Sequence, residues 1–141
     1  MQTCALRLSP GQDLKLALKE FADHHHLEAG IILTAIGSFD QAVLRFAGQD
    51  EGTILTGPLE LISLAGTLSP QGLHLHGAVA DGTGTLSAGH IMAGCVIRTT
   101  AEIVVANLPD LRFRRLLDPE TGYPELAIED LSQNPHQYKA S

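Results

Sequence analysis

From residue 27 onward the chain has no helical periodicity, and this feature constrains its fold more than any other. Apolar segments rich in β-branched residues follow one another at short intervals, separated by Gly, Asp and Pro, as in strands joined by turns. Because strands occur in a run rather than alternating with helices, the sequence favours an antiparallel sheet. The predicted strands cover 29–39, 41–48, 53–57, 58–69, 73–81, 95–108, 111–117 and 127–130.

The first 26 residues predict one strand and one helix. Residues 3–8 alternate in a strand-like way. In SPGQDLKLALKEFADHHH, residues 9–26, Ser9 is the expected helix cap, Pro10 lies in the first turn, and Gln12 follows three residues after the cap. An apolar stripe recurs at helical spacing and predicts the buried face. Its members are Leu14, Ala17, Leu18 and Phe21.

These elements predict an α+β fold, an antiparallel-rich sheet with one main α-helix packed on it. A length of 141 residues suits one domain with one core. We expect this domain to occupy residues 1–131 and a C-terminal tail to follow at 132–141.

Composition argues against several partners. The formal net charge is −7 and only nine residues are Lys or Arg, so the chain as a whole repels a phosphate backbone. Cys4 and Cys95 lie far apart and form no disulfide framework, as expected for reduced thiols. No apolar run is long enough to span a membrane. We therefore expect a cytoplasmic protein, without a membrane partner and with nucleic acid disfavoured.

Three of the seven histidines lie in GLHLHGAVADGTGTLSAGH, residues 72–90. On a strand, successive side chains point to opposite faces, so His74 and His76 share one face and Leu73 and Leu75 the other. Residues two apart on a strand are separated by roughly 6.5 to 7 Å, which lets two rings converge on one ion. The pair is therefore a candidate metal site, although half-buried histidines satisfied by hydrogen bonds give the same pattern.

A third ligand has to come from a neighbouring element. The intervening ADGTGTLSAG is rich in turn formers that fold the chain back and bring His90 opposite the pair. Gly89 and Gly94 allow close backbone approach around it. Three neutral imidazoles leave a position open on Zn²⁺, as in a catalytic site. The run His24 to His26 ends the predicted helix, where positive charge suits the helix dipole.

Six segments resemble one family, the plant- and prokaryote-conserved (PPC) domain. They are SPGQDL at 9–14, AIGSF at 35–39, GPLELISLAGTLS at 57–69, GLHLHGAVAD at 72–81, AGHIMAGCVIRTTAEIVV at 88–105 and FRRLLDPETGYPEL at 113–126. The resemblance implies a homotrimer and places His74, His76 and His90 on the zinc-binding histidines of bacterial members. The fold also resembles that of acetolactate decarboxylases, which is an analogy of fold alone.

The family includes members with a proposed DNA-binding role, so a DNA-binding regulator is the alternative function. Plant members carry an AT-hook, a basic arm built around Arg-Gly-Arg that enters the minor groove. This chain has no such arm, and its only local basic cluster is Arg112, Arg114 and Arg115. The resemblance therefore favours metal binding over DNA binding here.

A metal on the trio, Zn²⁺ or a similar divalent ion, would polarise a small oxygen-bearing ligand or activate water, and such chemistry needs a nearby acid or base. The sequence offers Glu60 and Glu102 as candidate catalytic residues, since strand alternation places Glu60 on a face with Ile62 and Leu64. Each is also compatible with a strand-edge charge or a partner of Arg98. Whether the protein is an enzyme stays open at this point.

Overall fold

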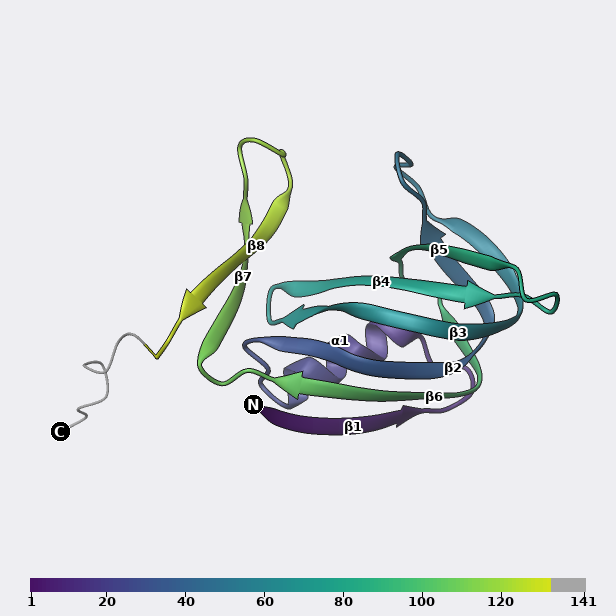
Figure 1. The fold of residues 1–141 in the computed structure, drawn as a ribbon, viewed down its shortest axis with the longest axis horizontal. Coiled ribbons are helices and arrows are strands. Elements are labelled where there is room, and N and C mark those ends of the chain that lie inside the picture. The colour runs from purple at the N-terminus through teal and green to yellow at the C-terminus, as the bar shows by residue number, and fades with distance from the viewer. Residues whose placement is uncertain (133–141) are drawn as a thin grey trace.

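The computed structural model describes residues 1–132, and its main element is a six-stranded antiparallel sheet (Figure 1). The strand order is β1-β6-β2-β3-β4-β5. The bounds are β1 Gln2–Leu8, β2 Gly30–Arg45, β3 Thr53–Ser69, β4 Gly72–Ala80, β5 Leu86–Ile91 and β6 Val96–Asn107. One helix, α1 (Leu14–His24), packs on this sheet, which confirms the predicted α+β fold.

The sheet curls because β5, at its edge, pairs both with β4 and with the end of β2. Strand β2 is 16 residues long and carries a bulge at Asp40, where Phe39 and Gln41 pair with the consecutive β6 residues Ile97 and Val96. A bulge bends its strand and increases the local twist. The last residues of β2 thereby reach β5, where Leu44 lies opposite Ile91. This closure brings the end of β2 beside the predicted histidine cluster.

Two pairs of predicted strands are each one long strand. Segments 29–39 and 41–48 merge into β2, since the bulge after Phe39 absorbs one residue without ending the ladder. Segments 53–57 and 58–69 merge into β3, where Thr56 still pairs with Gln41 and Leu59 with Phe39. The prediction of separate strands was wrong there because Asp and Pro were interpreted as turn signals, whereas they lie at a bulge.

Helix α1 begins later than the sequence predicts. Its N-cap is Asp13, whose Oδ1 accepts a hydrogen bond from the Leu16 amide at 3.0 Å. Ser9 and Gln12 instead form a turn, in which the Ser9 amide donates to Gln12 Oε1 at 2.7 Å. The Gly11 amide donates to the Ile97 carbonyl, so this turn is held on β6 and is not part of the helix. The predicted Ser9 cap is therefore corrected to Asp13.

The core lies between α1 and the sheet. Leu14 and Leu18 are fully buried, while Ala17 and Phe21 are partly buried against the same core, which confirms the predicted apolar stripe. The sheet contributes Phe39, the largest fully buried side chain. None of the helical structure among residues 1–132 is long and apolar enough to cross a membrane. The predicted tail lies outside the described residues, apart from residue 132.

A second, two-stranded sheet stands off from the main one (Figure 1). It consists of β7 (Leu111–Leu117) and β8 (Pro124–Asp130). Phe113 anchors it, because its side chain is buried and its amide donates to the Glu28 carbonyl at 2.9 Å. This hairpin carries Arg115 toward β3, where its guanidinium reaches Thr67.

Candidate metal centre

The structure brings His74, His76 and His90 together. His74 and His76 lie on β4 with Leu75 between them, and Leu75 is fully buried, so both rings point away from the core. His90 lies on β5 directly opposite His76 in the antiparallel register. Residues that are directly opposite present their side chains on the same face. The predicted convergence of the three histidines is therefore confirmed.

The three rings are close enough to share one ion. Their centroids lie 5.0, 5.2 and 5.5 Å apart, and one ligand nitrogen of each ring lies within 4.8 Å of the others. Nε2 of His74 is 3.2 Å from Nε2 of His76. Two nitrogens bound tetrahedrally to zinc at about 2.0 to 2.1 Å are separated by about 3.3 Å. Nδ1 of His90 is buried without a hydrogen-bond partner among the described residues. The trio thus fits a divalent ion.

The β4–β5 turn fixes this register. Asp81 Oδ1 accepts hydrogen bonds from the Thr83 amide, the Thr83 hydroxyl and the Thr85 amide at 2.8, 2.6 and 3.0 Å. Hydrogen bonds from the Thr83 hydroxyl and amide to the ionised carboxylate lower the pKa of Asp81. A shift of one residue would move His90 to the other face of β5. The hydrogen bonds of this turn therefore help to keep His90 on the same face as His74 and His76.

Close backbone packing supports the trio from both sides. A Cβ at Gly66, which lies opposite Leu75 and has φ +154°, would stand 2.0 Å from the His74 carbonyl oxygen. A Cβ at Gly89 would stand 2.8 Å from the Arg45 carbonyl oxygen. The predicted role of Gly89 in close approach is confirmed, and Gly66 adds a second such position.

Burial and positive neighbours keep two of the rings neutral. Burial, followed by the positive charge of Lys15 and the ring of His74, lowers the pKa of His90 to about 4. Burial also lowers the pKa of His74, with Arg115 as the next cause. Both rings are therefore neutral at pH 7, which is the state in which imidazole binds metals.

Three cationic side chains lie around the trio. Arg45 is directly opposite His90, and Lys15 Nζ donates to the Ile91 carbonyl at 3.1 Å. Arg115 Nη2 donates to Thr67 Oγ1 at 2.7 Å, and Thr67 is the cross-strand partner of His74. The sequence analysis missed these residues in this role.

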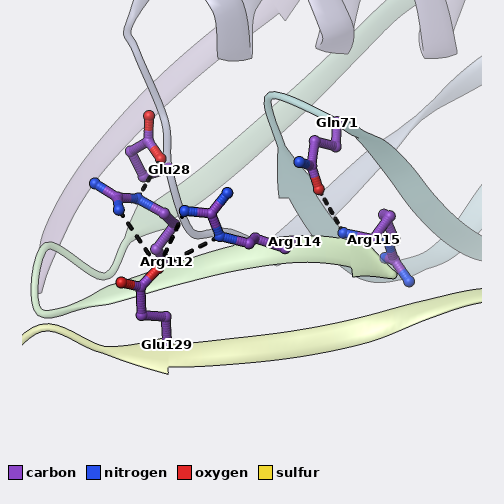
Figure 2. A network of polar contacts seen from close by, with 6 residues as sticks. All are labelled: Glu28, Gln71, Arg112, Arg114, Arg115 and Glu129. Carbon is purple, nitrogen blue, oxygen red and sulfur yellow. Dashed lines mark hydrogen bonds and ion pairs between the residues drawn. The ribbon is translucent and has the colours of Figure 1, made fainter. Parts of the chain in front are cut away.

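Arg114 and Arg115 point in different directions, as neighbours on a strand should (Figure 2). Arg114 and Arg112 both reach Glu129, and Arg112 also binds Glu28 at 2.9 Å. The Arg115 amide donates to Gln71 Oε1 at 2.6 Å, and no described carboxylate lies within ion-pair distance of its guanidinium. Strand alternation in LRFRRLL was the available signal that Arg115 differs from its neighbours.

The trio opens into a groove of about 760 Å³ between the main sheet and the hairpin. Glu125 and Tyr123 of the hairpin side line it, together with Asp50. Metal chemistry requires a nearby acid or base. Glu125 is a candidate for it, because its carboxylate lines both hollows that His74 lines. No sequence pattern singles it out, because its place depends on how the hairpin packs.

Glu60 and Glu102 are exposed and lie elsewhere on the sheet. Glu60 is five residues along β3 from Ala65, the partner of His76, a separation of about 16 Å. Glu102 lies opposite Ile36, nine residues along β2 from Arg45, or roughly 30 Å along the strand. Neither contacts the trio, and their catalytic role stays a prediction without geometric support. Arg98 binds Asp40 at 3.1 Å rather than either glutamate.

The other histidines within residues 1–132, the turn aspartate Asp118 and Cys95 lie away from the trio or have structural roles. His24 is the last helical residue and His25 the C-cap, and within residues 1–132 the only histidine grouping with metal-ligand spacing is the trio. Asp118 shapes its turn by accepting from the Glu120 amide at 2.8 Å. Cys95 is fully buried in the core.

Comparison with known proteins identifies the family. Residues 1–109 match the sequence model of the Plants and Prokaryotes Conserved (PCC) domain. The chain belongs to this family. Its β7–β8 hairpin, with Arg115 and Glu125, follows the part of this PCC protein that the family model covers.

Similar proteins include two curated relatives, each named bifunctional protein GlmU. The relative from Synechococcus sp. (strain JA-3-3Ab) is 52% identical over 128 residues, which is 91% of this chain. The one from Synechococcus sp. (strain JA-2-3B'a(2-13)) is 49% identical over 130 residues, or 92% of this chain. The chain spans only 21% of the length of each of these relatives.

Two solved structures share the fold. A hypothetical protein from Salmonella enterica is 45% identical, with a TM-score of 0.90, over 92% of this chain and 94% of that one. A metal-containing protein from Archaeoglobus fulgidus is 27% identical, with a TM-score of 0.77, over 90% of this chain and 94% of that one.

Proposed function

We propose that this PCC domain binds one divalent metal ion, zinc in the first place, through His74, His76 and His90. The observation that carries the proposal is the convergence of the three ring nitrogens within 4.8 Å. The metal content of the Archaeoglobus fulgidus protein, which shares the fold at 27% identity, supports it.

Three histidine ligands leave a tetrahedral ion one open position, which we assign to a small oxygen-bearing ligand. The ion, held by the three histidines, would act as a Lewis acid on a ligand at the open position. The chain's own contribution is to orient the rings through the β4–β5 register and to line the groove in front of them. Glu125 stands at this groove as the carboxylate placed to exchange a proton with a bound ligand.

We further propose that the protein works as a homotrimer in the cytoplasm. Large apolar side chains on the outer face of the sheet support self-association, since Ile36 and Ile62 are 57% and 52% exposed and lie on neighbouring strands. Cys4 and Cys95 are free thiols, in keeping with a reducing compartment. Light scattering on the purified protein should give three times the 15.0 kDa mass of one chain, and a monomeric mass would reject the trimer.

Metal analysis tests the main proposal. Protein dialysed against a chelator, reloaded with Zn²⁺ and desalted should retain about one ion per chain by elemental analysis. A double variant, His74→Ala with His76→Ala, should retain none. The matched control is His24→Ala with His25→Ala at the end of α1, which should retain metal as the natural sequence does. Unchanged metal in the first variant would end the proposal.

A further inference from the structure

We propose that the ligand of the metal site is a small anion, a carboxylate or a phosphate, held by the cationic side chains that surround the trio. This inference rests on the proposed metal function and names the chemical class of its ligand. The observation that carries it is the position of the Lys and Arg side chains that, within residues 1–132, are in no ion pair.

The eight Lys and Arg side chains within residues 1–132 fall into two groups. Four are in ion pairs with carboxylates, namely Lys19, Arg98, Arg112 and Arg114. Four others, Arg7, Lys15, Arg45 and Arg115, have no described carboxylate within ion-pair distance. Three of these four lie at the trio, and only Arg7 lies elsewhere, on β1. Unpaired positive charge is therefore concentrated at one place.

Each of the three cations belongs to a residue beside a histidine of the trio, and the Arg45 guanidinium also donates to the Gln49 carbonyl at 3.2 Å. Arg45 lies opposite His90 in the register. Lys15 reaches the carbonyl of the residue after His90, at 3.1 Å. Arg115 holds the hydroxyl of Thr67, which lies opposite His74, at 2.7 Å. The three therefore approach the trio from α1, β2 and β7, which are separate elements of the fold.

The charge at this place runs against the composition of the chain. The whole protein carries a formal charge of −7, yet Lys15, Arg45 and Arg115 are gathered around the three imidazoles. Two carboxylates, Glu125 and Asp50, also line the groove, and Glu125 Oε1 accepts a hydrogen bond from the Thr121 hydroxyl at 3.0 Å. A divalent ion adds further positive charge, so an anion at its open position relieves repulsion that the protein leaves in place.

The chemistry of the cations selects the ligand class. A guanidinium donates two parallel hydrogen bonds to a carboxylate or a phosphate, and Arg115 uses one of its nitrogens on Thr67. An oxyanion with one oxygen on the metal and another on Arg115 or Arg45 satisfies both. The groove of about 760 Å³ has room for a small molecule bearing such a group.

The test measures anion binding by calorimetry to protein whose metal content has been verified. The probes are inorganic phosphate and malonate, with glycerol as the uncharged control and chloride to match ionic strength. We expect saturable binding of phosphate or malonate and none of glycerol. Because coupling is reciprocal, the same anion should tighten zinc binding.

Paired variants locate the binding. Arg115→Gln should weaken the anion about tenfold or more with metal content unchanged, since it removes a charge-assisted hydrogen bond. The matched control, Arg114→Gln, changes the neighbouring arginine that binds Glu129 and should stay within about twofold. Arg45→Gln should weaken the anion in the same direction as Arg115→Gln.

The outcomes distinguish failure of anion binding from failure of metal binding. Binding of phosphate alone, or of malonate alone, supports the inference and shows whether the ligand is a phosphate or a carboxylate. Stoichiometric metal with neither anion bound, or equal binding to Arg115→Gln and Arg114→Gln, overturns the inference and leaves the metal function standing. If the natural sequence takes up no metal, the proposed function fails, and this inference fails with it.

Discussion

His76 and His90 lie directly opposite one another on β4 and β5, with their ring centroids 5.5 Å apart. The pair joins two strands whose connecting turn is held by one aspartate, Asp81. The geometry of the candidate metal centre is thus a consequence of strand register, and changes to the backbone that sets the register should alter the positions of the three rings.

Gly66→Ala should destabilise the protein and disturb His74. The added Cβ would lie 2.0 Å from the His74 carbonyl oxygen, so β3 and β4 have to separate locally. We expect a loss of about 3 kcal/mol or more in the free energy of unfolding, measured with urea, and weaker zinc retention. Gly82→Ala is the control, because nothing lies within 4 Å of its added Cβ. Equal stability of the two variants would contradict the packing described for β3 and β4.

Asp13→Ala should destabilise α1 at its start. Asp13 Oδ1 caps the helix through the Leu16 amide, and Oδ2 accepts from the Gly94 amide next to β6. Loss of an aspartate N-cap costs about 1 to 2 kcal/mol of unfolding free energy. The control is Asp23→Ala, which removes an exposed pair with Lys19 worth about 0.5 kcal/mol or less. If Ser9→Ala were the more damaging change, Asp13 would not be the cap.

The β4–β5 turn should make stability depend on acid. Hydrogen bonds from Thr83 lower the pKa of Asp81 below its usual value of 3.8, so the folded state binds this proton less readily than the unfolded chain. The stabilising effect is therefore present above pH 3.8 and is lost as the pH falls further. Urea unfolding of the natural sequence and of Asp81→Ala should show a difference at pH 6 that narrows toward pH 2.5. A difference that grows in acid would refute this role.

Duplex DNA should not bind. The net charge is −7, and the described Lys and Arg side chains, apart from Arg7 on β1, are either in ion pairs or gathered at the trio, so they form no extended basic surface for a phosphate backbone. Fluorescence anisotropy with a labelled duplex at low ionic strength should show no saturable signal. Affinity that falls steeply as salt is added would favour the DNA-binding alternative.

The sequence predicted what local periodicity controls. Alternation placed His74 and His76 on one face, and the turn formers after Ala80 brought His90 back beside them. Periodicity also identified the buried stripe of α1. It did not identify the residue that caps the helix, because Ser9 and Asp13 are both good cap residues. Asp13 prevails because residues 9–12 are held against β6 by backbone hydrogen bonds at Gly11 and Ile97, which sequence does not show.

Features that depend on packing between distant elements were not predictable. Arg115 reaches the site because β7 packs beside β3, 48 residues away from Thr67 in the chain. Lys15 reaches it from a helix 76 residues before Ile91. Alternation also failed at β3, where a bulge between Leu61 and Ser63 leaves Glu60 and Ile62 exposed while Leu64 is buried. Such bulges and contacts follow from tertiary structure.

The most direct measurement of the central claim is anomalous X-ray scattering near the zinc edge, from crystals of protein purified without added metal and then soaked in zinc. The account predicts one strong peak at about 2.0 to 2.1 Å from a nitrogen of each of His74, His76 and His90. Absence of a peak there, or rings turned toward separate hydrogen-bond partners, would contradict it.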